Sequence, residues 1–396
     1  MAVVLPKAAT PPRRVTILGS TGSVGCSTID LISRNPAAFV VEAITAGRNV
    51  QLVAEQALKL RPRFVALADP AGYRDLKAAL SGSGIEIAVG PESVIAAAER
   101  PSDWLMAAIV GAAGLAPVLA AIRRGAIIAF ANKECLVSAG ALMMREVRQN
   151  GATLLPVDSE HNAIFQVFDF DRRDSVVELL LTASGGPFRG RSRDEMSRVT
   201  PAEATAHPNW DMGAKISVDS ATMMNKGLEI IEAHHLFGMP EDRISVLVHP
   251  QSVIHSLVRY VDGSVLAQLG QPDMRTPIAH ALAWPDRMAV PVAPLDLAAL
   301  ASLTFEAPDP ERFPALRLAR EVLRAGGTMP TVLNAANEVA VAGFLEGKIG
   351  FLDIAGVVDH ILDSIPRREA ENLQNVLDAD IDARRCAGDR INRLAR

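Results

Sequence analysis

At 396 residues, with 49% apolar and 21% charged residues, the chain is long enough for two or three globular domains. Its formal net charge of −5 argues against a nucleic-acid or anionic-membrane partner, so any basic site must be local. Three widely spaced cysteines indicate reduced thiols in a cytoplasmic protein, and neither a signal peptide nor a membrane span is expected.

Short β-rich runs alternate with amphipathic segments in the first part of the chain. This rhythm predicts an α/β fold that begins with a Rossmann-like, doubly wound parallel sheet covered by helices on both faces. The predicted strands are 15–19, 40–47, 64–69, 86–90, 105–111, 126–132 and 152–158.

A glycine loop, GSTGSVG at 19–25, directly follows the first predicted strand and precedes a helical segment. Glycine lets the backbone approach a pyrophosphate, which then sits at the positive end of the helix. The spacing differs from G-x-G-x-x-G, so the prediction of a nucleotide site depends on the strand before and the helix after. A purely structural glycine turn is the alternative.

The second predicted strand ends in the sequence AGRN, where Arg48 and Asn49 stand in place of the acidic residue typical of NAD sites. A guanidinium here suits a 2′-phosphate, which favours NADPH over NADH. The alternative is a surface arginine without a ligand.

Asn132, Lys133 and Glu134 follow the sixth predicted strand. Ligands of such sheets gather beyond the carboxyl ends of the strands, so these side chains are expected to meet cofactor or substrate. The alternative is a helix start with a capping Asn and an early Glu.

The stretch VDSEH places Asp158 and Glu160 at the end of the seventh predicted strand. If the strand continues, both carboxylates point to the same side and repel each other unless a cation lies between them. The alternative is that one carboxylate caps a helix while the other faces water.

A long helix around 220–236, with a cap expected at Asp219 or Ser220, would carry Asn225 and Glu229 on one face. If Glu229 meets Asp158 and Glu160, the three form an all-oxygen set that suits Mg²⁺ or Mn²⁺. His161 is expected to be a hydrogen-bond partner instead of a ligand, and the His234–His235 pair is expected to decorate the surface.

Ser184 follows the predicted strand 176–182 and precedes two glycines, an arrangement that exposes a hydroxyl and backbone N–H groups to an oxyanion. With Ser220, Asn225 and Lys226 it could bind a phosphate. The Gly-, Pro- and Arg-rich segment 185–214, which carries HPNWDMG, is expected to be a lid. The alternative is an ordinary loop whose Trp210 packs on the domain surface.

The second half of the chain predicts a central α/β catalytic domain with a mixed sheet, then a small C-terminal helical domain. The predicted catalytic domain includes a strand at 244–250 and a hairpin with its turn at Asp262–Gly263. Six prolines mark a surface linker, and helices are expected over 315–346 and 351–365 with a break at Gly326–Gly327. The predicted domains are 1–157 for NADPH binding, 158–285 for catalysis and metal binding with the lid 185–214, a linker over 286–314, and a helical domain over 315–396.

Seven motifs, GSTGSVG, AGRN, ANKE, LPVDSEHNAIFQ, ASGGPFR, HPNWDMG and SVDSATMMNKGLE, occur in this order. From about residue 14 to 370 the chain resembles the 1-deoxy-D-xylulose 5-phosphate reductoisomerase family. The resemblance implies a homodimer that converts this sugar phosphate to 2-C-methyl-D-erythritol 4-phosphate for isoprenoid synthesis. It also implies NADPH and Mg²⁺, Mn²⁺ or Co²⁺ as cofactors.

Carried over motif by motif, the resemblance implies a set of site residues. The metal ligands would be Asp158, Glu160 and Glu229. The NADPH contacts would be Thr21, Gly22, Ser23, Val24, Gly47, Arg48, Asn49, Asn132, Glu134 and Gly213. The substrate contacts would be Lys133, Ser159, Glu160, Ser184, His207, Ser220, Asn225, Lys226 and Glu229, with Trp210 and Met212 in the lid.

Three of these residues are the candidate catalytic groups. Lys133 would stabilise developing oxyanion charge, and Glu160 or His207 would assist proton movement. Two other classes of function stay open on the residues alone. One is a metal-dependent NADP dehydrogenase or oxidative decarboxylase that acts without skeletal rearrangement, and the other is a non-catalytic nucleotide sensor.

Overall fold

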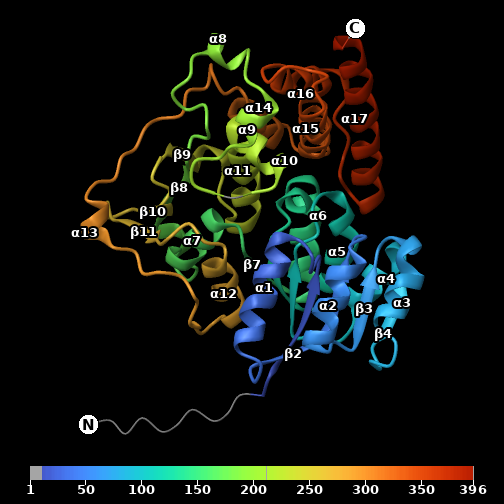
Figure 1. Cartoon of the computed structure of the whole chain (residues 1–396). Coiled ribbons are helices and arrows are strands. Elements are labelled where there is room, and N and C mark those ends of the chain that lie inside the picture. Colours follow the sequence, from blue (N-terminus) through green and yellow to red (C-terminus); the bar gives the residue numbers. More distant parts are fainter. Residues whose placement is uncertain (1–10, 211, 396) are drawn as a thin grey trace, which may run out of the picture. The chain divides into compact units, whose positions relative to one another are not determined.

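The computed structural model describes residues 11–210 and 212–395, and the chain divides into two compact units (Figure 1). Neither unit is continuous in sequence. Unit 1 comprises the chain up to Ala131, Glu146–Leu155 and Ile278–Val290, and unit 2 comprises Asn132–Arg145, Pro156–Pro277 and Pro291–Arg396. The functional division at residues 157, 285 and 314 stays a prediction.

Unit 1 is built on a seven-stranded sheet with the order β4-β3-β2-β1-β5-β6-β7, and its pairings from β4 through β6 are parallel. A strand lies in every predicted run, although the fifth ends at Ala107, four residues early. The strands are β1 Arg13–Leu18, β2 Phe39–Ala46, β3 Phe64–Leu67, β4 Glu86–Val89, β5 Trp104–Ala107, β6 Ile127–Phe130 and β7 Thr153–Pro156. The order reverses beside β1, the point at which such sheets bind nucleotides.

Helices connect these strands, as the alternating pattern predicts (Figure 1). They are α1 Ser23–Arg34, α2 Val50–Leu60, α3 Tyr73–Ala79, α4 Pro91–Glu99, α5 Leu115–Arg123 and α6 Lys133–Asn150, with short 3-10 turns at Pro70–Gly72 and Ala112–Gly114.

The glycine loop 19–25 runs from the end of β1 into α1. A Cβ atom at Gly25 would lie only 2.3 Å from the Gly19 carbonyl oxygen, so no other residue lets α1 begin this close to the strand. On the other side of the loop, Ser20 Oγ donates to Gln56 Oε1 over 2.7 Å, and Gln56 Nε2 donates to the Ser20 carbonyl over 2.9 Å. The loop is therefore fixed to α2 by buried hydrogen bonds.

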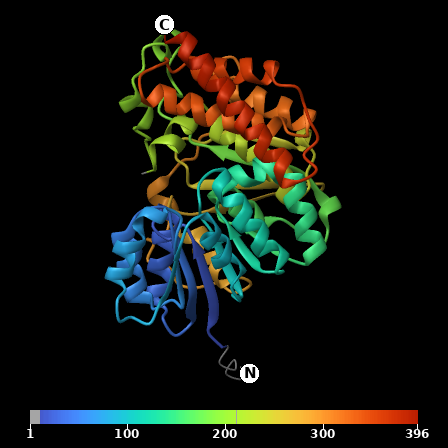
Figure 2. The same cartoon turned by 90° about the vertical axis from the view of Figure 1, so that its right-hand side faces the viewer.

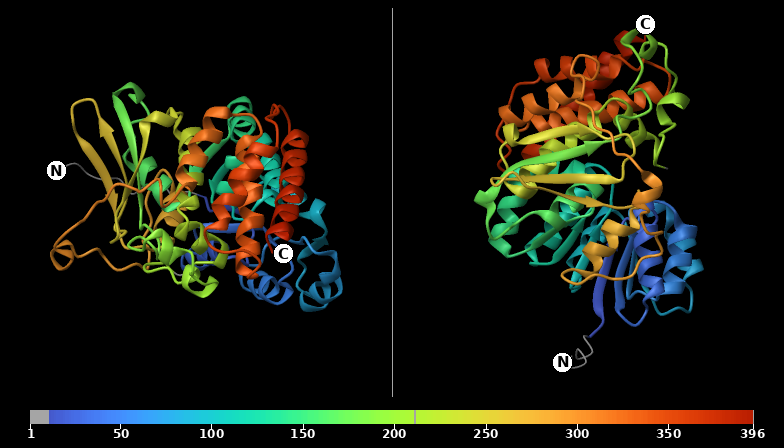
Figure 3. Two further views of the ribbon diagram at one scale, coloured as in Figure 1. Left: turned by 90° about the horizontal axis from the view of Figure 1, so that it is seen from above. Right: turned by 90° about the vertical axis from the view of Figure 1, so that its left-hand side faces the viewer.

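Unit 2 contains a four-stranded mixed sheet with the order β11-β10-β8-β9 (Figure 3). Its strands are β8 Val176–Ala183, β9 Ile244–Val248, β10 Ile254–Tyr260 and β11 Val265–Leu269. β8 and β9 are parallel, whereas β10 is antiparallel to both β8 and β11. The predicted mixed sheet and the hairpin around Asp262–Gly263 are confirmed.

Helices α7 and α11 pack against this sheet, and further helices form the C-terminal part of unit 2, where α17 lies along α15 (Figure 2). The helices are α7 Ser159–Val167, α8 Arg193–Met196, α9 Pro201–Thr205, α10 Ala214–Ala221, α11 Met224–Phe237, α13 Leu297–Leu300, α14 Ala315–Ala325, α15 Met329–Leu345, α16 Asp353–Ser364 and α17 Leu373–Leu394, with 3-10 turns at Arg173–Ser175 and Glu241–Arg243. Helix α12, Arg275–Ala283, begins in unit 2 and continues into unit 1. One hydrophobic core includes Leu181 of β8, Leu228 of α11, and Val332 of α15. The C-terminal helices therefore share the core of the catalytic segment.

The single helix expected around 220–236 is wrong in one respect, because two helices occupy this stretch. Met223 has a φ of 62°, and this left-handed residue ends α10 and starts α11. A left-handed conformation costs a non-glycine residue on the order of 1–2 kcal/mol. The cap expected at Asp219 or Ser220 is also wrong, since both residues lie inside α10.

The proline-rich stretch 286–314 holds only the four-residue helix α13 and a bridge from Glu306 to Val248. Of the helices in the described residues, none combines the length and the apolar character that crossing a bilayer would require.

Candidate active site

Asp158, Glu160 and Glu229 meet in unit 2, where one carboxylate oxygen of each lies within 4.8 Å of the others. We call these three residues the carboxylate cluster. The predicted reason for the proximity of the first two is wrong, because β7 ends at Pro156 and does not continue through VDSEH. Asp158 instead occupies the N-cap position of α7 and Glu160 lies in its first turn, which brings both side chains to the same helix end.

Two lysines neutralise part of this charge. Lys133, at the start of α6, forms ion pairs with Asp158 and, over 3.2 Å, with Glu229. Lys226 of α11 forms ion pairs with Glu229 and, over 2.7 Å, with Glu160. Both lysines are at least nine-tenths buried, so the attraction is weakly screened by water.

Asn225 completes this arrangement. Its Oδ1 accepts a hydrogen bond from Lys133 Nζ over 3.0 Å, and its Nδ2 donates to Glu229 Oε1 over 2.5 Å. Asn225 and Lys226, which the sequence suggested as phosphate donors, are therefore bonded to the carboxylate cluster in this structure.

The cluster retains an excess of negative charge. Burial and the neighbouring Glu160 raise the pKa of Glu229 to about 7. Burial acts in the same direction on Asp158, but Lys133, His161 and Lys226 outweigh it and lower the pKa of that carboxyl. Burial acts to lower the pKa of Lys133, yet Asp158 and Glu229 raise it well above the usual lysine value. The lysines are thus cationic, while one carboxyl is poised to take up a proton when no further cation is present.

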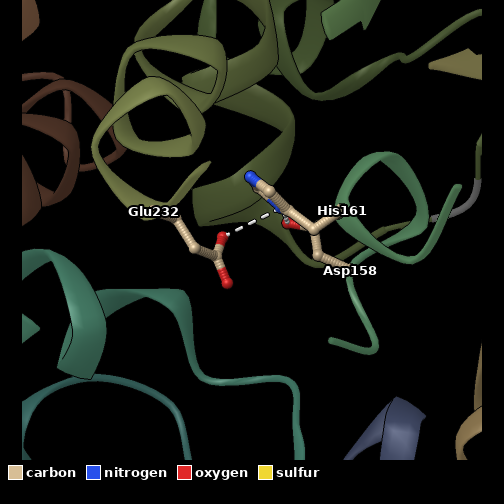
Figure 4. A group of neighbouring side chains, drawn as sticks. All are labelled: Asp158, His161 and Glu232. Carbon is tan, nitrogen blue, oxygen red and sulfur yellow. Dashed lines mark ion pairs between the residues drawn. The ribbon is translucent and has the colours of Figure 1, made fainter. Parts of the chain in front are cut away.

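A second group of potential ligands shares Asp158 and adds His161 and Glu232 (Figure 4). His161 Nδ1 lies 3.2 Å from Glu232 Oε2, and its Nε2 lies 3.0 Å from the Glu229 carbonyl oxygen. The imidazole thus connects α7 with α11 directly behind the carboxylate cluster. This placement agrees with the expectation that His161 is a hydrogen-bond partner.

The start of α6 shows the helix cap that the sequence offered as one alternative, while contacts of these residues with cofactor or substrate stay a prediction. The Asn132 side chain accepts a hydrogen bond from the Cys135 N–H over 3.2 Å, as a capping residue does. Lys133 points to the carboxylate cluster, and Glu134 accepts from Lys215 over 3.4 Å.

Of the expected anion-binding groups, Ser184 and Ser220 lie in neighbouring segments. Ser184 Oγ lies 2.9 Å from His207 Nε2 and accepts from the Gly186 N–H over 3.1 Å. Gly186 has a φ of 68°, and a Cβ there would lie 2.7 Å from the Ser220 carbonyl oxygen. The loop after β8 therefore lies directly against the end of α10, which carries Ser220. Ser159, next to the cluster, donates to Glu160.

The segment expected to be a lid is anchored near its C-terminal end. His207 Nδ1 accepts from the backbone N–H of Trp210 over 3.0 Å, and Asn209 Nδ2 donates to the Pro250 carbonyl over 2.7 Å. The indole of Trp210 lies 6.3 Å from the ring of His255. Burial lowers the pKa of His207, so this residue is a neutral imidazole near pH 7. Met212 is half-buried and Gly213 is exposed.

In unit 1 the expected cofactor residues surround the glycine loop and the end of β2. Gly22, Ser23, Gly47, Arg48 and Asn49 are exposed, and Thr21 and Val24 are half-buried. Asn49 also caps α2, since its Oδ1 accepts from the Leu52 N–H over 3.1 Å. The exposed backbone at the start of α1 matches the requirement of a pyrophosphate site.

Three residues of unit 2 that contact predicted site residues were not identified from the sequence. Glu232 follows Glu229 by three residues and so shares its helix face, a spacing that would have identified it. His255 lies between Ile254 and Ser256 in β10, and nothing local relates it to Trp210. Lys215 lies in the first turn of α10, and its partner Glu134 is distant in the chain.

One expectation about histidines is wrong. His235 is not a surface residue, because its ring fills the space in which a side chain at Gly140 would lie. Burial and the neighbouring His234 lower the pKa of His235 to about 4.

The chain is similar to known proteins. The family described as "1-deoxy-D-xylulose 5-phosphate reductoisomerase" matches residues 15–140, and its C-terminal domains match residues 154–237 and 269–386. The match thus extends past residue 370, where the motifs carried no resemblance.

Relatives agree over nearly the whole length. The 1-deoxy-D-xylulose 5-phosphate reductoisomerase of Rhodospirillum centenum is 66% identical over 379 residues, which cover 96% of this chain and 94% of that protein. The one of Zymomonas mobilis is 58% identical over 373 residues, 94% of this chain and 96% of that protein.

Solved structures agree as well. The Zymomonas mobilis enzyme in complex with NADPH superposes with a TM-score of 0.92 at 56% identity, covering 96% of this chain and 99% of that one. A DOX-P reductoisomerase in complex with NADPH, fosmidomycin and magnesium gives 0.93 at 44% identity, covering 96% and 98%. This chain therefore belongs to the 1-deoxy-D-xylulose 5-phosphate reductoisomerase family.

Proposed function

We propose that the protein converts 1-deoxy-D-xylulose 5-phosphate to 2-C-methyl-D-erythritol 4-phosphate, with NADPH and Mg²⁺ or Mn²⁺ as cofactors. The observation that carries the proposal is the convergence of Asp158, Glu160 and Glu229 in a chain of this family. Three acids brought together from distant segments are costly to bury unless they bind a cation.

The residues present fit a divalent metal. Their donor atoms are carboxylate oxygens, the hard ligands that Mg²⁺ and Mn²⁺ prefer. Two ammonium groups do not balance the three acids and the adjacent Glu232, and the raised pKa of Glu229 reflects that excess charge. When bound, a divalent cation supplies Lewis acidity and NADPH supplies a hydride.

The chain's own groups then have distinct tasks. Lys133 keeps its proton because Asp158 and Glu229 surround it, so its ammonium stabilises an oxyanion that develops on the substrate. His207, neutral and within hydrogen-bond distance of Ser184, accepts or returns a proton, and Glu160 is the alternative group for this task.

The phosphate of the substrate is held by donors from several elements. Ser184 and Ser220 are adjacent through the contact of Gly186 with the Ser220 backbone, and Asn225 and Lys226 begin the helix that follows. Ser159 and His207 contribute at the other side of the same site, which segment 185–214 covers as a lid that excludes water.

NADPH is recognised by backbone and by one cation. The exposed loop of Thr21–Val24 meets the pyrophosphate, and Arg48 meets the 2′-phosphate. Gly47, Asn49, Asn132, Glu134 and Gly213 complete the proposed contacts.

The protein acts as a cytoplasmic homodimer in this proposal. Its three cysteines are free thiols, which suits a reducing compartment. The edge strand β11 exposes Val265 and Leu266 to about half of their full extent, 45% and 49%, and so offers an apolar edge to a second copy.

A turnover assay tests the proposal. NADPH oxidation with 1-deoxy-D-xylulose 5-phosphate is expected with added Mg²⁺ or Mn²⁺ and is expected to disappear with a chelator. Simple hydroxy acids serve as control substrates for a dehydrogenase that works without rearrangement. Turnover that needs no divalent metal, or that prefers the hydroxy acids, would refute the proposal.

A further inference from the structure

Lys215 joins two carboxylates that come from different parts of unit 2. It lies in the first turn of α10, immediately after the segment expected to be a lid. Its Nζ lies 2.7 Å from Asp219 Oδ2 on the same helix and donates to Glu134 Oε1 of α6 over 3.4 Å. One ammonium group therefore connects the start of α6 to α10.

The ion pairs of Lys215 differ from those of Lys133 and Lys226. In the described part of the chain, its ion pairs lead to Glu134 and Asp219, and none leads to the carboxylate cluster. Burial acts to lower the pKa of Lys215, but Asp219 and Glu134 raise it, so the group is a permanent cation. Lys215 therefore fixes the positions of its partners and does not release its proton near neutral pH.

Asp219 is held from both sides. Its side chain is 1% exposed, Lys215 contacts one oxygen, and Asn337 Nδ2 of α15 donates to the other over 2.8 Å. A buried carboxylate with two fixed partners has one orientation available. Because Ser220 is the next residue of α10, these contacts also set the position from which the Ser220 hydroxyl projects.

Glu134 is held in a similar way. It lies next to Lys133 in the first turn of α6, is 9% exposed as a residue, and has Lys215 as its ion-pair partner. Removal of the ammonium group would leave this carboxylate free to change rotamer.

We propose that Lys215 is a positioning residue that sets Glu134 for the cofactor and, through Asp219, sets Ser220 for the phosphate of the substrate. The inference rests on the proposed function, because the two ligands are those of the reductoisomerase reaction. Among the described residues, the ion pairs of Lys215 do not reach the carboxylate cluster. The inference nevertheless predicts that a single substitution of Lys215 weakens the binding of both NADPH and the sugar phosphate.

The test compares Lys215→Met, Lys215→Arg and the control Arg320→Met in the full-length protein. Arg320 is a matched control, since it is also a half-buried cation of unit 2, 26% exposed against 28%, and pairs with Glu241 away from the proposed ligand residues. NADPH affinity is measured by fluorescence titration, KM and kcat by turnover, and Tm by thermal unfolding.

For Lys215→Met we expect the Kd of NADPH and the KM of the sugar phosphate each to rise on the order of tenfold, since small misplacements of binding groups have effects of this size or more. Lys215→Arg is expected to recover most of both constants because it keeps the charge. Arg320→Met is expected to lower Tm without a change in either constant.

A further variant separates the two branches and serves if Lys215→Met does not fold. Asn337→Leu removes a hydrogen bond of Asp219 only, so KM should rise while the Kd of NADPH stays constant. Unchanged constants in Lys215→Met or in Asn337→Leu, or equal changes in Arg320→Met, would overturn the inference. A wild-type protein without turnover would overturn the proposed function itself, whereas an active wild type beside unaffected variants refutes the positioning role alone.

Discussion

The glycine loop of unit 1 presents exposed backbone at Gly22 and Ser23, whereas the carboxylate cluster of unit 2 consists of charged side chains such as Lys133 and Glu229 that are removed from water. The loop needs no ionisable group, and its shape follows from residues that lie within a short stretch. The cluster needs partners from α6, α7 and α11, and its charges perturb one another. A site made of backbone is damaged by an added atom, while a site made of buried charges is damaged by a lost charge.

The largest effect is expected where a charge of the cluster is removed. Glu229→Gln should lower kcat/KM by on the order of 10³-fold and weaken Mg²⁺ binding, since a metal ligand supplies several kcal/mol of transition-state stabilisation. Steady-state kinetics and metal titration measure both. Glu178→Gln is the control, because Glu178 is likewise paired with a cation, Arg259, but is only half-buried and lies in the sheet. Near-normal activity of Glu229→Gln would remove this residue from the metal site.

The second largest effect is expected when a methyl group is added to the glycine loop. Gly25→Ala places a Cβ 2.3 Å from the Gly19 carbonyl, so the loop must shift and NADPH affinity should fall on the order of 10²-fold. Fluorescence titration with NADPH checks the change. Gly388→Ala in α17, where a Cβ meets no atom within 4 Å, should bind NADPH as the wild type does. Equal affinity in both variants would show that the loop does not hold the cofactor.

A smaller change is expected from Arg48, the one cation among the proposed cofactor contacts. Arg48→Ala should weaken NADPH binding by about tenfold and leave NADH binding unaffected, since only NADPH carries the 2′-phosphate. The ratio of the two dissociation constants is the measurement. Arg34→Ala, which removes an exposed arginine of α1, should leave the ratio unchanged. A parallel loss for both nucleotides would argue against recognition of the 2′-phosphate.

The smallest expected effect concerns pH and stability without metal. Because the folded-state pKa of Glu229 is raised from 4.5 to about 7, the folded state binds this proton more tightly than the unfolded state does. Its contribution to stability is therefore present at pH 4.5 and is lost as the pH rises to 7. His235 and His280, with pKa values lowered to about 4, act in the opposite direction between pH 4 and 6.5.

The difference between wild type and Glu229→Gln isolates the carboxyl from the histidines. We expect the Tm of metal-free wild type to fall relative to that of the variant by a few degrees between pH 5 and 7.5, which corresponds to about 1–2 kcal/mol. Mg²⁺ should reverse this relative loss in the wild type. A constant difference across the pH range would show that the cluster does not carry excess charge.

Local patterns were sufficient to predict the strands of both sheets and several of the helices. Alternating runs located the strands of unit 1, and Gly326–Gly327 located the break between α14 and α15. They failed at VDSEH, where periodicity favoured a longer strand although the chain turns into α7. They also failed at Met223, since nothing in its side chain favours a left-handed conformation.

The assembly of the candidate site could be anticipated only through the family motifs. Asp158 and Glu229 approach each other because α7 and α11 both pack against strands of the unit 2 sheet, and packing between distant segments leaves no trace in local spacing. The same reason explains why Lys215 and its partner Glu134 were not connected from the sequence. Glu232 is different, because its helical spacing from Glu229 was present in the sequence and was overlooked.

Unit 1 is built from three segments that are separated in the sequence, and this has a consequence for its biosynthesis. The indole N–H of Trp104, fully buried in β5, donates to the Ala281 carbonyl over 2.9 Å, and Arg13 of β1 donates to the Leu282 carbonyl over 2.6 Å. These acceptors leave the ribosome long after the strands that need them. A nascent chain that ends before residue 278 therefore has all seven strands of the first sheet but an incomplete first unit, in which the indole N–H of Trp104 lacks its acceptor, while much of the second unit has already been made.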